Sequence, residues 1–544
     1  MNLENLLHDR LAPALEAVAG EPVDPAVRAS PFADFQSAAP LALARKLGRP
    51  PREVAAEVAA KADLPGITVS GPGFLNITVA DEVITESLAA AARDPRLGVP
   101  PVSRPERIVL DYSGPNVAKE MHVGHLRSTV IGDALARILE WQGHHVQRVN
   151  HLGDWGTPFG MLIEHLTELG GAGEHSLGDL TAFYQAARLK FDSDADFRTR
   201  ARLRVVALQA GDGPTRELWR RLVGQSERAF LDAYHRLGVT LGPGDFAGES
   251  SYQEDLAGIV DELGEQGLLT ESDGALCAFP AGFTGRDGGP LPLIIRKGDG
   301  GFGYAATDLA ALRRRVRALG ATELLYVVGT PQRVHFQMVF AVARAAGWLP
   351  GEVTAEHIGF GSILGTDGRM LKTRAGGTVR LAELLDEAAA RASAPEIGIA
   401  AIKYADLSAD RRADYVFDWD RMLASTGNTG PYLQYAYARI RSLSRKAAGE
   451  PGEIRVTDPA ERALGLALLG FEPALRAAGA AREPHRLAGY LHDLAAVFNV
   501  FWERCPVSSA APDLRASRKA LAELTGRTLH TGMSLLGIEA PERI

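Results

Sequence analysis

The start of the chain carries apolar side chains on one helical face. They recur at spacings of three or four residues: Leu3, Leu6, Leu7, Leu11 and Leu15. This spacing predicts an amphipathic helix that Gly20 can close. Segments 40–47 and 54–61 also have a helical pattern, whereas Gly73–Val79 alternates apolar and polar residues as a half-buried strand does. Together these elements predict a small α+β domain, which we assign to residues 1–95.

A strand–helix–strand pattern follows a linker at 94–105 that holds four prolines and one glycine. Ile108–Leu110 is a short apolar run of strand type, Leu126–Gln142 has an apolar helical face, and His145–Asn150 alternates as a strand. This βαβ unit predicts a doubly wound, Rossmann-like parallel sheet of the α/β class. Such sheets bind ligands beyond the carboxyl ends of their strands, so the loop at 111–125 lies at the expected ligand-binding edge.

The rest of the pattern divides the chain further. Residues after about 165 are mostly helical by period and lead into a stretch rich in Gly and Pro, so we expect an insertion at about 165–290 between the halves of the sheet. Leu324–Gly329 is predicted to be another buried strand. We expect the whole Rossmann-type domain to span 104–392. The helical periodicity after it predicts an all-α bundle at 394–544.

Charge limits the class of partner. The 544 residues carry a formal net charge of −8, which excludes a protein that binds nucleic acid through a broadly positive surface. Any such contact must be local. Basic residues cluster in two segments of helical pattern: Arg313, Arg314, Arg315 and Arg317, then Arg439, Arg441, Arg445 and Lys446. Taken alone, each cluster is typical of a solvated helix face.

Cysteine usage and hydropathy indicate the compartment. Cys277 and Cys505 are too few for a disulfide framework and too far apart for a paired-ligand zinc motif, so we expect a reducing cytoplasm. The N-terminus has no basic run followed by an unbroken apolar stretch, and no later stretch approaches the roughly 20 apolar residues that cross a bilayer. We therefore expect no membrane role.

Two histidines carry the sharpest chemical signal. His122 and His125 stand three residues apart between a predicted strand and the first turn of a helix, where backbone N–H groups and the positive end of the helix dipole are exposed. Gly124 between them leaves room for a nucleotide, and imidazoles can donate to phosphate oxygens as charge builds there. Taken without their surroundings, the two histidines have an alternative interpretation, namely two polar residues that cap a helix.

The surrounding segments resemble a known family. Asp111–Thr129, which contains the two histidines, is similar almost residue for residue to the HIGH signature region of class I arginyl-tRNA synthetases, and His151–Thr157 is similar to the Gly-Asp-Trp-Gly segment of that family. Pro158 departs from it, because the family usually has glutamine there, and we assign that position no role. The resemblance implies an enzyme that forms arginyl-adenylate and then charges tRNA.

The second class I signature is expected after the last strand of the sheet. Arg369–Thr378 stands there and resembles the arginyl variant of the KMSKS loop. Lys372 keeps the second lysine, a point charge suited to the departing pyrophosphate. Arg369 replaces the first lysine, and the resemblance implies that Lys119 supplies the missing charge. It also places His335, with His122, Gly124, His125 and Lys372, at the ATP.

Recognition of arginine needs hydrogen-bond acceptors for the N–H groups of the guanidinium. Tyr304 and Asp308 are one helical turn apart, and the resemblance implies that Asp308 binds the guanidinium with Tyr304 beside it. It further implies that four residues surround the α-amino and carboxylate end: Asp111, Ser113, Asn116 and Gln332. The alternative for Asp308 is a residue that starts a helix.

The resemblance covers essentially the whole chain. It implies that the N-terminal domain contacts the outer corner of the tRNA and that the bundle binds the anticodon, with Tyr432, Tyr435, Arg439 and Arg445 as candidate tRNA contacts. Unpaired bases could stack on tyrosines there, Tyr437 included, although aromatics in a bundle are more often core. The last ten residues, 535–544, are expected to dock against the bundle. The implied partners are MgATP, L-arginine and tRNA(Arg), with no tightly bound protein metal, in a monomeric cytoplasmic enzyme.

Three alternatives remain. Gly298–Gly303 fits the G-x-G-x-x-G pattern of nicotinamide enzymes, with Glu323 further on, but the pattern places the helix start several residues after the last glycine and favours a β-turn. A small-molecule adenylyltransferase would share the histidine motif but would need no RNA-sized helical domain. A duplicated synthetase with a resistance or biosynthetic role would share every feature above.

Overall fold

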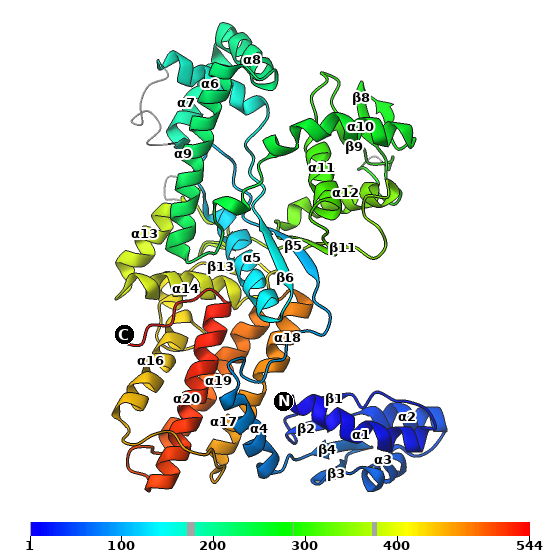
Figure 1. Cartoon of the computed structure of the whole chain (residues 1–544), viewed down its shortest axis with the longest axis vertical. Helices are drawn as coiled ribbons and strands as arrows, with labels where there is room; N and C mark the ends of the chain where they lie inside the picture. The colour runs from blue at the N-terminus through cyan, green and yellow to red at the C-terminus, as the bar shows by residue number, and fades with distance from the viewer. Residues whose placement is uncertain (1, 171–179, 287, 373–377) are drawn as a thin grey trace.

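Four parallel strands form the central sheet, in the order β11-β10-β5-β6. Their bounds are Arg107–Asp111 (β5), His145–Val149 (β6), Glu323–Tyr326 (β10) and Thr354–His357 (β11). Helix α5 (Val123–Trp141) joins β5 to β6, which confirms the predicted βαβ unit. This is a computed structural model that describes residues 2–170, 180–286, 288–372 and 378–544 (Figure 1). Most residues of α5 are buried, including the polar residues Arg127 and Asp133, so α5 is a core helix of the molecule.

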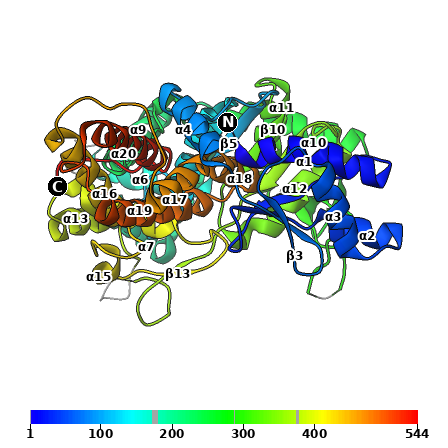
Figure 2. The ribbon, with the colours of Figure 1, turned by 90° about the horizontal axis from the view of Figure 1, so that it is seen from below.

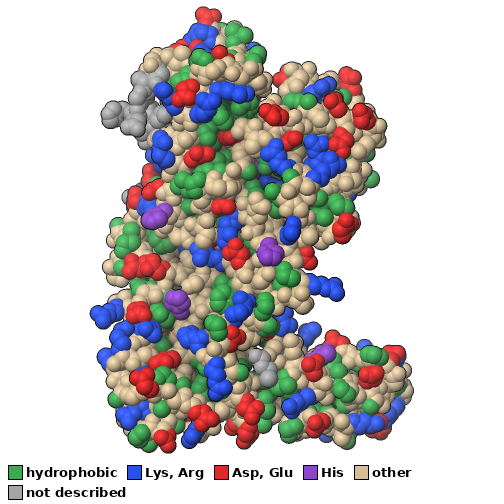
Figure 3. Space-filling view, viewed as in Figure 1, with side chains coloured by type: hydrophobic (Ala, Val, Ile, Leu, Met, Phe, Trp, Pro, Cys, Tyr) green, Lys and Arg blue, Asp and Glu red, His purple; other side chains and the backbone are tan. Residues whose placement is uncertain are grey.

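Two lobes are inserted between β6 and β10. The first holds helices α6 (Thr157–Glu168), α7 (Leu180–Ser193), α8 (Ala195–Gln209) and α9 (Gly213–Leu237). The second holds α10 (Leu256–Glu265), the antiparallel sheet of β7 (Thr270–Ser272), β8 (Ala275–Ala278) and β9 (Leu293–Arg296), and helix α11 (Tyr304–Arg317). Helix α12 (Arg333–Ala345) follows β10 in the chain, joins it to β11 and packs against α11. The lobes stand apart at one end of the molecule (Figure 1), and Figure 3 shows a hollow between them.

The glycine-rich segment at 298–303 forms a hairpin turn. Gly300 N–H donates to the Lys297 carbonyl at 3.0 Å, as in a β-turn, and the preceding strand β9 is antiparallel. The expected start of the next helix was wrong, because α11 begins at Tyr304, directly after Gly303. The turn interpretation nevertheless holds, because a dinucleotide fingerprint requires a parallel strand that leads into its helix.

The C-terminal region is a helical bundle. Its helices are α14 (Pro395–Leu407), α15 (Trp419–Met422), α16 (Gly430–Lys446), α17 (Pro459–Leu469), α18 (Phe471–Ala481), α19 (His485–Arg504) and α20 (Pro512–Leu535). The region is not wholly helical, because β13 (Tyr415–Val416) pairs with β12 (Ile363–Leu364) of the preceding domain. The chain end docks as expected, with Ile538 buried and Gln434 Nε2 donating to the Glu539 carbonyl at 2.8 Å.

Arg462 is one of the residues that tie the N-terminal domain to this bundle. The domain contains α1 (Leu3–Ala19), α2 (Ala39–Leu47), α3 (Pro51–Lys61) and an antiparallel sheet of β1 (Val27–Ala29), β2 (Phe35–Ser37), β4 (Phe74–Ile77) and β3 (Ile67–Ser70). The next helix, α4 (Asp81–Arg93), packs against α17 of the bundle (Figure 1). Arg462 of α17 donates to both carboxylate oxygens of Asp34, at 2.8 and 2.7 Å, and to Asp81 at 2.8 Å. Figure 2 shows this domain projecting from the side of the bundle opposite the C-terminus.

The structure changes the expectation about membrane-spanning segments. By length and composition, the segment 459–481 is apolar enough to cross a bilayer, contrary to the expectation that no stretch came close. It consists of α17 and α18, which meet at Gly470, and half of it is buried in the bundle, as a core segment of this composition would be.

The first basic cluster is not a solvated face. Arg315 is buried and pairs with Asp111, and Arg313 and Arg314 pair with Glu262 and Asp255. These acidic partners offset the positive charge of the stripe, although Arg317 remains exposed. On the face in view in Figure 3, basic side chains are mixed with acidic ones throughout.

Candidate active site

A cavity of about 620 Å³ opens beyond the carboxyl ends of β5 and β10, at the predicted edge of the sheet. Ten of the predicted site residues line it: Asp111, Ser113, Asn116, His122, Gly124, His125, Tyr304, Asp308, Gln332 and His335. They come from three separate stretches of sequence. The sheet therefore brings together the side chains that were predicted to contact ATP and those that were predicted to contact arginine.

The two histidines form the N-terminal cap of α5. His122 Nδ1 accepts the Gly124 N–H at 3.0 Å, and His125 Nδ1 accepts the His122 N–H at 3.1 Å. The capping alternative is therefore realised. Since each Nδ1 is an acceptor, each neutral ring carries its proton on Nε2 and has one donor left.

Electrostatics keep these rings neutral. Burial, and after it the neighbouring His122 ring, lower the pKa of His125 to about 3. Burial and the nearby Lys119 ammonium also hold the pKa of His122 below its usual value. Both rings are thus neutral hydrogen-bond donors at neutral pH, and they lie beside the N-terminus of α5, where an anion is stabilised.

The second signature loop is anchored next to the first. Lys372 and Thr378 form an antiparallel bridge, and Val379 accepts the Val123 N–H of α5 at 2.9 Å. The segment between them, 373–377, lies outside the described residues, so the predicted loop is only partly described. Lys372 is exposed and does not line the cavity.

Lys119 lies at a neighbouring cavity of about 370 Å³. Its ammonium is 4.4 Å from the ring centroid of Tyr184, a cation–π contact. Asn116 and Tyr304 line both cavities, so the two spaces adjoin. Lys119 and Lys372 thus lie outside the first cavity, on separate loops.

Asp308 lies in α11 and lines the first cavity. Its Oδ2 is 2.6 Å from His335 Nε2. The N-cap of α11 is Gly303, so Asp308 does not start the helix and that alternative is wrong. Tyr304 is 75% exposed, which leaves its ring available to a ligand.

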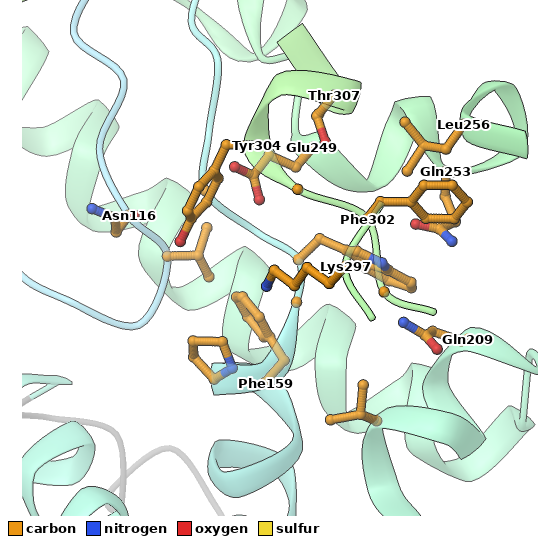
Figure 4. Close-up of a pocket in the computed structure, with 18 of the residues that line it drawn as sticks. Asn116, Phe159, Gln209, Glu249, Gln253, Leu256, Lys297, Phe302, Tyr304 and Thr307 are labelled. Atoms are coloured by element: carbon orange, nitrogen blue, oxygen red, sulfur yellow. The ribbon is translucent and has the colours of Figure 1, made fainter. Parts of the chain in front are cut away.

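Glu249 is a site residue that the sequence analysis missed. It lines both cavities, and Figure 4 shows its carboxyl beside the Tyr304 ring. Burial, reinforced by the Asp308 and Asp154 carboxylates, raises its pKa to about 8. A carboxyl group in this environment favours binding of a cation. No periodicity or motif marked it; the one cue was an acidic residue in a Gly-Glu-Ser-Ser turn.

The Gly-Asp-Trp-Gly segment lines the two cavities and positions residues around them. Asp154 accepts the Ser250 N–H at 2.8 Å and the Ser250 hydroxyl at 2.6 Å, which holds the Glu249 turn in place. A side chain at Gly153 would meet the Asn116 carboxamide at 2.5 Å, so glycine is required for this approach. The segment therefore positions two cavity residues.

Asp111 is less available than expected. Its Oδ2 accepts from Arg315 Nη2 at 2.7 Å, and both side chains are buried. The guanidinium also lies 5.1 Å from the Tyr326 ring centroid. One carboxylate oxygen is thus occupied within the protein, and the pair helps to hold the end of β5 against α11.

The four candidate tRNA contacts all lie on α16 but differ in how exposed they are. Tyr432 is half-buried and its hydroxyl accepts from Asn499 at 2.9 Å, and Arg439 donates to the same Asn499 at 2.7 Å. Tyr435 is 37% exposed and Arg445 is exposed. Tyr437 is buried and belongs to the core.

Three family models match the chain. They are described as tRNA synthetases class I (R), catalytic domain, over residues 100–396; DALR anticodon binding domain, over 433–544; and arginyl tRNA synthetase N terminal domain, over 2–79.

Similar proteins agree with these matches. An arginine–tRNA ligase of Thermobifida fusca is 52% identical, with 99% of each chain covered, and one of Frankia casuarinae is 51% identical, with 96% of this chain and 95% of the relative covered. Among solved structures, arginyl-tRNA synthetase from Plasmodium falciparum superposes with a TM-score of 0.86 at 27% identity, over 100% of this chain and 99% of that one. The Thermus thermophilus enzyme gives 0.82 at 26%, with both chains fully covered.

Proposed function

The chain belongs to the arginyl-tRNA synthetase family and is an arginine–tRNA ligase, and we propose that the cavity beyond β5 and β10 is where it activates arginine. A carboxylate oxygen of arginine attacks the α-phosphorus of ATP, and the bond to the bridging oxygen breaks as diphosphate leaves. The terminal ribose hydroxyl of the tRNA then attacks the carbonyl carbon of the adenylate, and AMP departs with the bonding electrons.

The part of the cavity beside the N-terminus of α5 binds the phosphates of ATP. The Nε2–H groups of His122 and His125 donate to phosphate oxygens as charge develops, and Gly124 admits the nucleotide next to the backbone. Lys372 and Lys119 contribute positive charge from the two loops that border this end, and His335 contacts the nucleotide. Catalysis rests on orientation and charge stabilisation, since the protein forms no covalent intermediate in these steps.

The α11 end selects the amino acid. Asp308 binds the guanidinium with Tyr304 beside it, and the α-amino and carboxylate groups contact four polar residues: Asp111, Ser113, Asn116 and Gln332. Glu249 supports this assignment, because a second, partly buried carboxyl group near Asp308 adds to the preference for a cation.

The remaining parts serve the RNA. We propose that the N-terminal domain (1–95) contacts the outer corner of tRNA(Arg), that 104–392 is the catalytic domain and that 394–544 binds the anticodon. Mg²⁺ arrives with ATP as part of the substrate complex. The enzyme acts as a monomer in the cytoplasm, where its tRNA is found.

The observation that carries this proposal is the convergence of ten predicted residues on one cavity. A charging assay tests it, in which labelled amino acids are offered one at a time with ATP and total tRNA. Arginine alone should be attached, and the Asp308→Asn variant should need far more arginine. Attachment of another amino acid, or none, would overturn the assignment.

A further inference from the structure

The loop between β5 and α5 contains two strained residues. Ser113 has φ +75° and Ala118 has φ +59°, a left-handed conformation that favours glycine. Both are buried. Non-glycine residues in this region persist only where surrounding contacts hold them, and such strain gathers at binding sites.

Two side chains on one face of helix α9 form hydrogen bonds with these two strained residues. The Tyr234 hydroxyl lies 2.7 Å from Ser113 Oγ, and Ser226 Oγ accepts the Ala118 N–H at 2.9 Å. Ser226 and Tyr234 are two helical turns apart on α9, so they share a face, and both are buried. Figure 1 shows α9 running from the tip of the first lobe down to α13 (Leu381–Arg391).

The hydrogen bonds around Ser113 have one consistent direction. Thr129 Oγ1 lies within donating distance of two oxygens, the His125 carbonyl at 2.7 Å and Ser113 Oγ at 2.9 Å. Because a carbonyl only accepts and a hydroxyl has a single proton, we assign the Thr129 proton to the carbonyl, so that Ser113 donates to Thr129. Tyr234 must then donate to Ser113, and the Asn150 amide donates to Tyr234 at 2.8 Å. The chain therefore runs from Asn150 through three hydroxyls to the signature helix.

This direction determines what Ser113 offers to a ligand. Its single proton points to Thr129 and one lone pair takes the Tyr234 proton, so the free lone pair facing the cavity is an acceptor. An acceptor suits an ammonium group and not a carboxylate.

We propose that Tyr234 and Ser226 are positioning residues for arginine activation, and that α9 acts through them on the strained loop. Tyr234 orients Ser113 Oγ as an acceptor for the α-ammonium group of arginine. Ser226 fixes Ala118, and thereby the adjacent Lys119 near the phosphate end. The inference rests on the proposed roles of Ser113 and Lys119.

Two conservative variants separate these effects. Tyr234→Phe keeps the ring and removes the hydroxyl, and it should raise the KM for arginine about tenfold, as the loss of a buried hydrogen bond does, with kcat and the KM for ATP within about twofold. Ser226→Ala should instead lower kcat several-fold and leave the KM for arginine unchanged. Tyr404→Phe is the matched control, because it removes a buried hydroxyl that bonds Asn428 within the bundle, and it should change neither constant.

Hydrogen exchange gives a readout that does not depend on activity. In the full-length protein, both α9 variants should speed amide exchange in peptides covering 111–121 and leave those covering α16 unchanged, which also shows that the variants fold. Tyr404→Phe should not affect 111–121. Unchanged exchange in 111–121 for both α9 variants would overturn the inference.

Ser113→Ala distinguishes the inference from the proposed site. If Ser113→Ala raises the KM for arginine and Tyr234→Phe does not, α9 has no positioning role although the site assignment stands. If Ser113→Ala leaves that KM unchanged, the assignment of Ser113 is wrong and the inference falls with it. In the double variant, the two changes should combine to less than their product, since they act on one contact.

Discussion

The two ends of the active-site cavity are built on opposite electrostatic principles. At the α5 end, two neutral imidazoles and a helix N-terminus present donors. At the α11 end, Asp308 and Glu249 present carboxyl groups, and burial together with the nearby Asp308 carboxylate raises the pKa of Glu249. One end is suited to phosphate and the other to a cation, so a single cavity can separate catalysis from amino-acid choice.

The difference also concerns how far each end is prepared before substrate binds. The histidines already make their backbone contacts and keep one donor free. Asp308, in contrast, is engaged by His335, and Glu249 holds its proton until a cation arrives. Changes at the α11 end should therefore affect mainly the arginine requirement, whereas changes at the α5 end should affect mainly turnover.

The largest effect is expected from Asp308→Ala. Truncating one partner of a buried charged pair costs roughly 3 to 5 kcal/mol, or about two to three and a half orders of magnitude in the KM for arginine. kcat at saturating arginine should change little. Steady-state charging kinetics would measure both constants, with Asp255→Ala as a control on a pair away from the cavity. Activation at wild-type arginine concentrations would show that another carboxylate binds the guanidinium.

Alanine in place of His122 or His125 should lower kcat, in contrast to the Asp308 variant, which should raise the KM for arginine. Loss of one donor to developing charge lowers kcat by about 10²- to 10³-fold. The KM for arginine should stay within about threefold, and the exposed His145→Ala variant should behave as wild type. Because the pKa of His125 is about 3, its protonation should leave no step in the kcat profile between pH 6 and 8. Unchanged turnover in both variants would remove the phosphate role.

A smaller loss is expected from Lys372→Ala. The residue is exposed at the anchored base of the second loop, so its charge is partly screened until the substrate is enclosed. We expect kcat to fall about 10- to 100-fold, with Lys372→Arg restoring most of it because the charge is kept. Equal defects in the two variants would indicate a role in shape and not in charge.

Glu249 should give the mildest and most specific signature. Its pKa in the empty site is about 8, and bound guanidinium favours the ionised form, so binding releases a proton below that pH. The KM for arginine should therefore fall as the pH rises from 6.5 to 8, by at most about tenfold per unit, and level off above 8. Glu249→Gln should flatten this dependence. A wild-type KM that is constant over the range would exclude the coupling.

The elements that follow local patterns could be predicted from the sequence. The βαβ unit, the first helix and the strand at 74–77 each follow from periodicity and a glycine or proline at the boundary. The start of α11 was misplaced because Gly298–Gly303 combines a hairpin turn with a helix N-cap, and a run of glycines does not show where one ends and the other begins.

Features that depend on long-range packing could not be read from the pattern. Arg315 looked like part of a solvated stripe, yet its partner Asp111 lies 204 residues away in sequence. Glu249 enters the cavity only because Asp154 anchors the following serine. The short strand β13 forms because it pairs with β12, and nothing in its two residues alone requires a strand.

The most direct test of the two-ended cavity is arginine-dependent exchange between ATP and labelled pyrophosphate, measured with each amino acid, with and without total tRNA. We predict exchange with arginine in the presence of tRNA and with no other combination, because Arg369 replaces the usual first lysine and RNA binding then biases closure of the loop. Exchange with arginine in the absence of tRNA would refute that coupling and keep the activity. No exchange with arginine under either condition would contradict the account and favour a duplicated enzyme with another role.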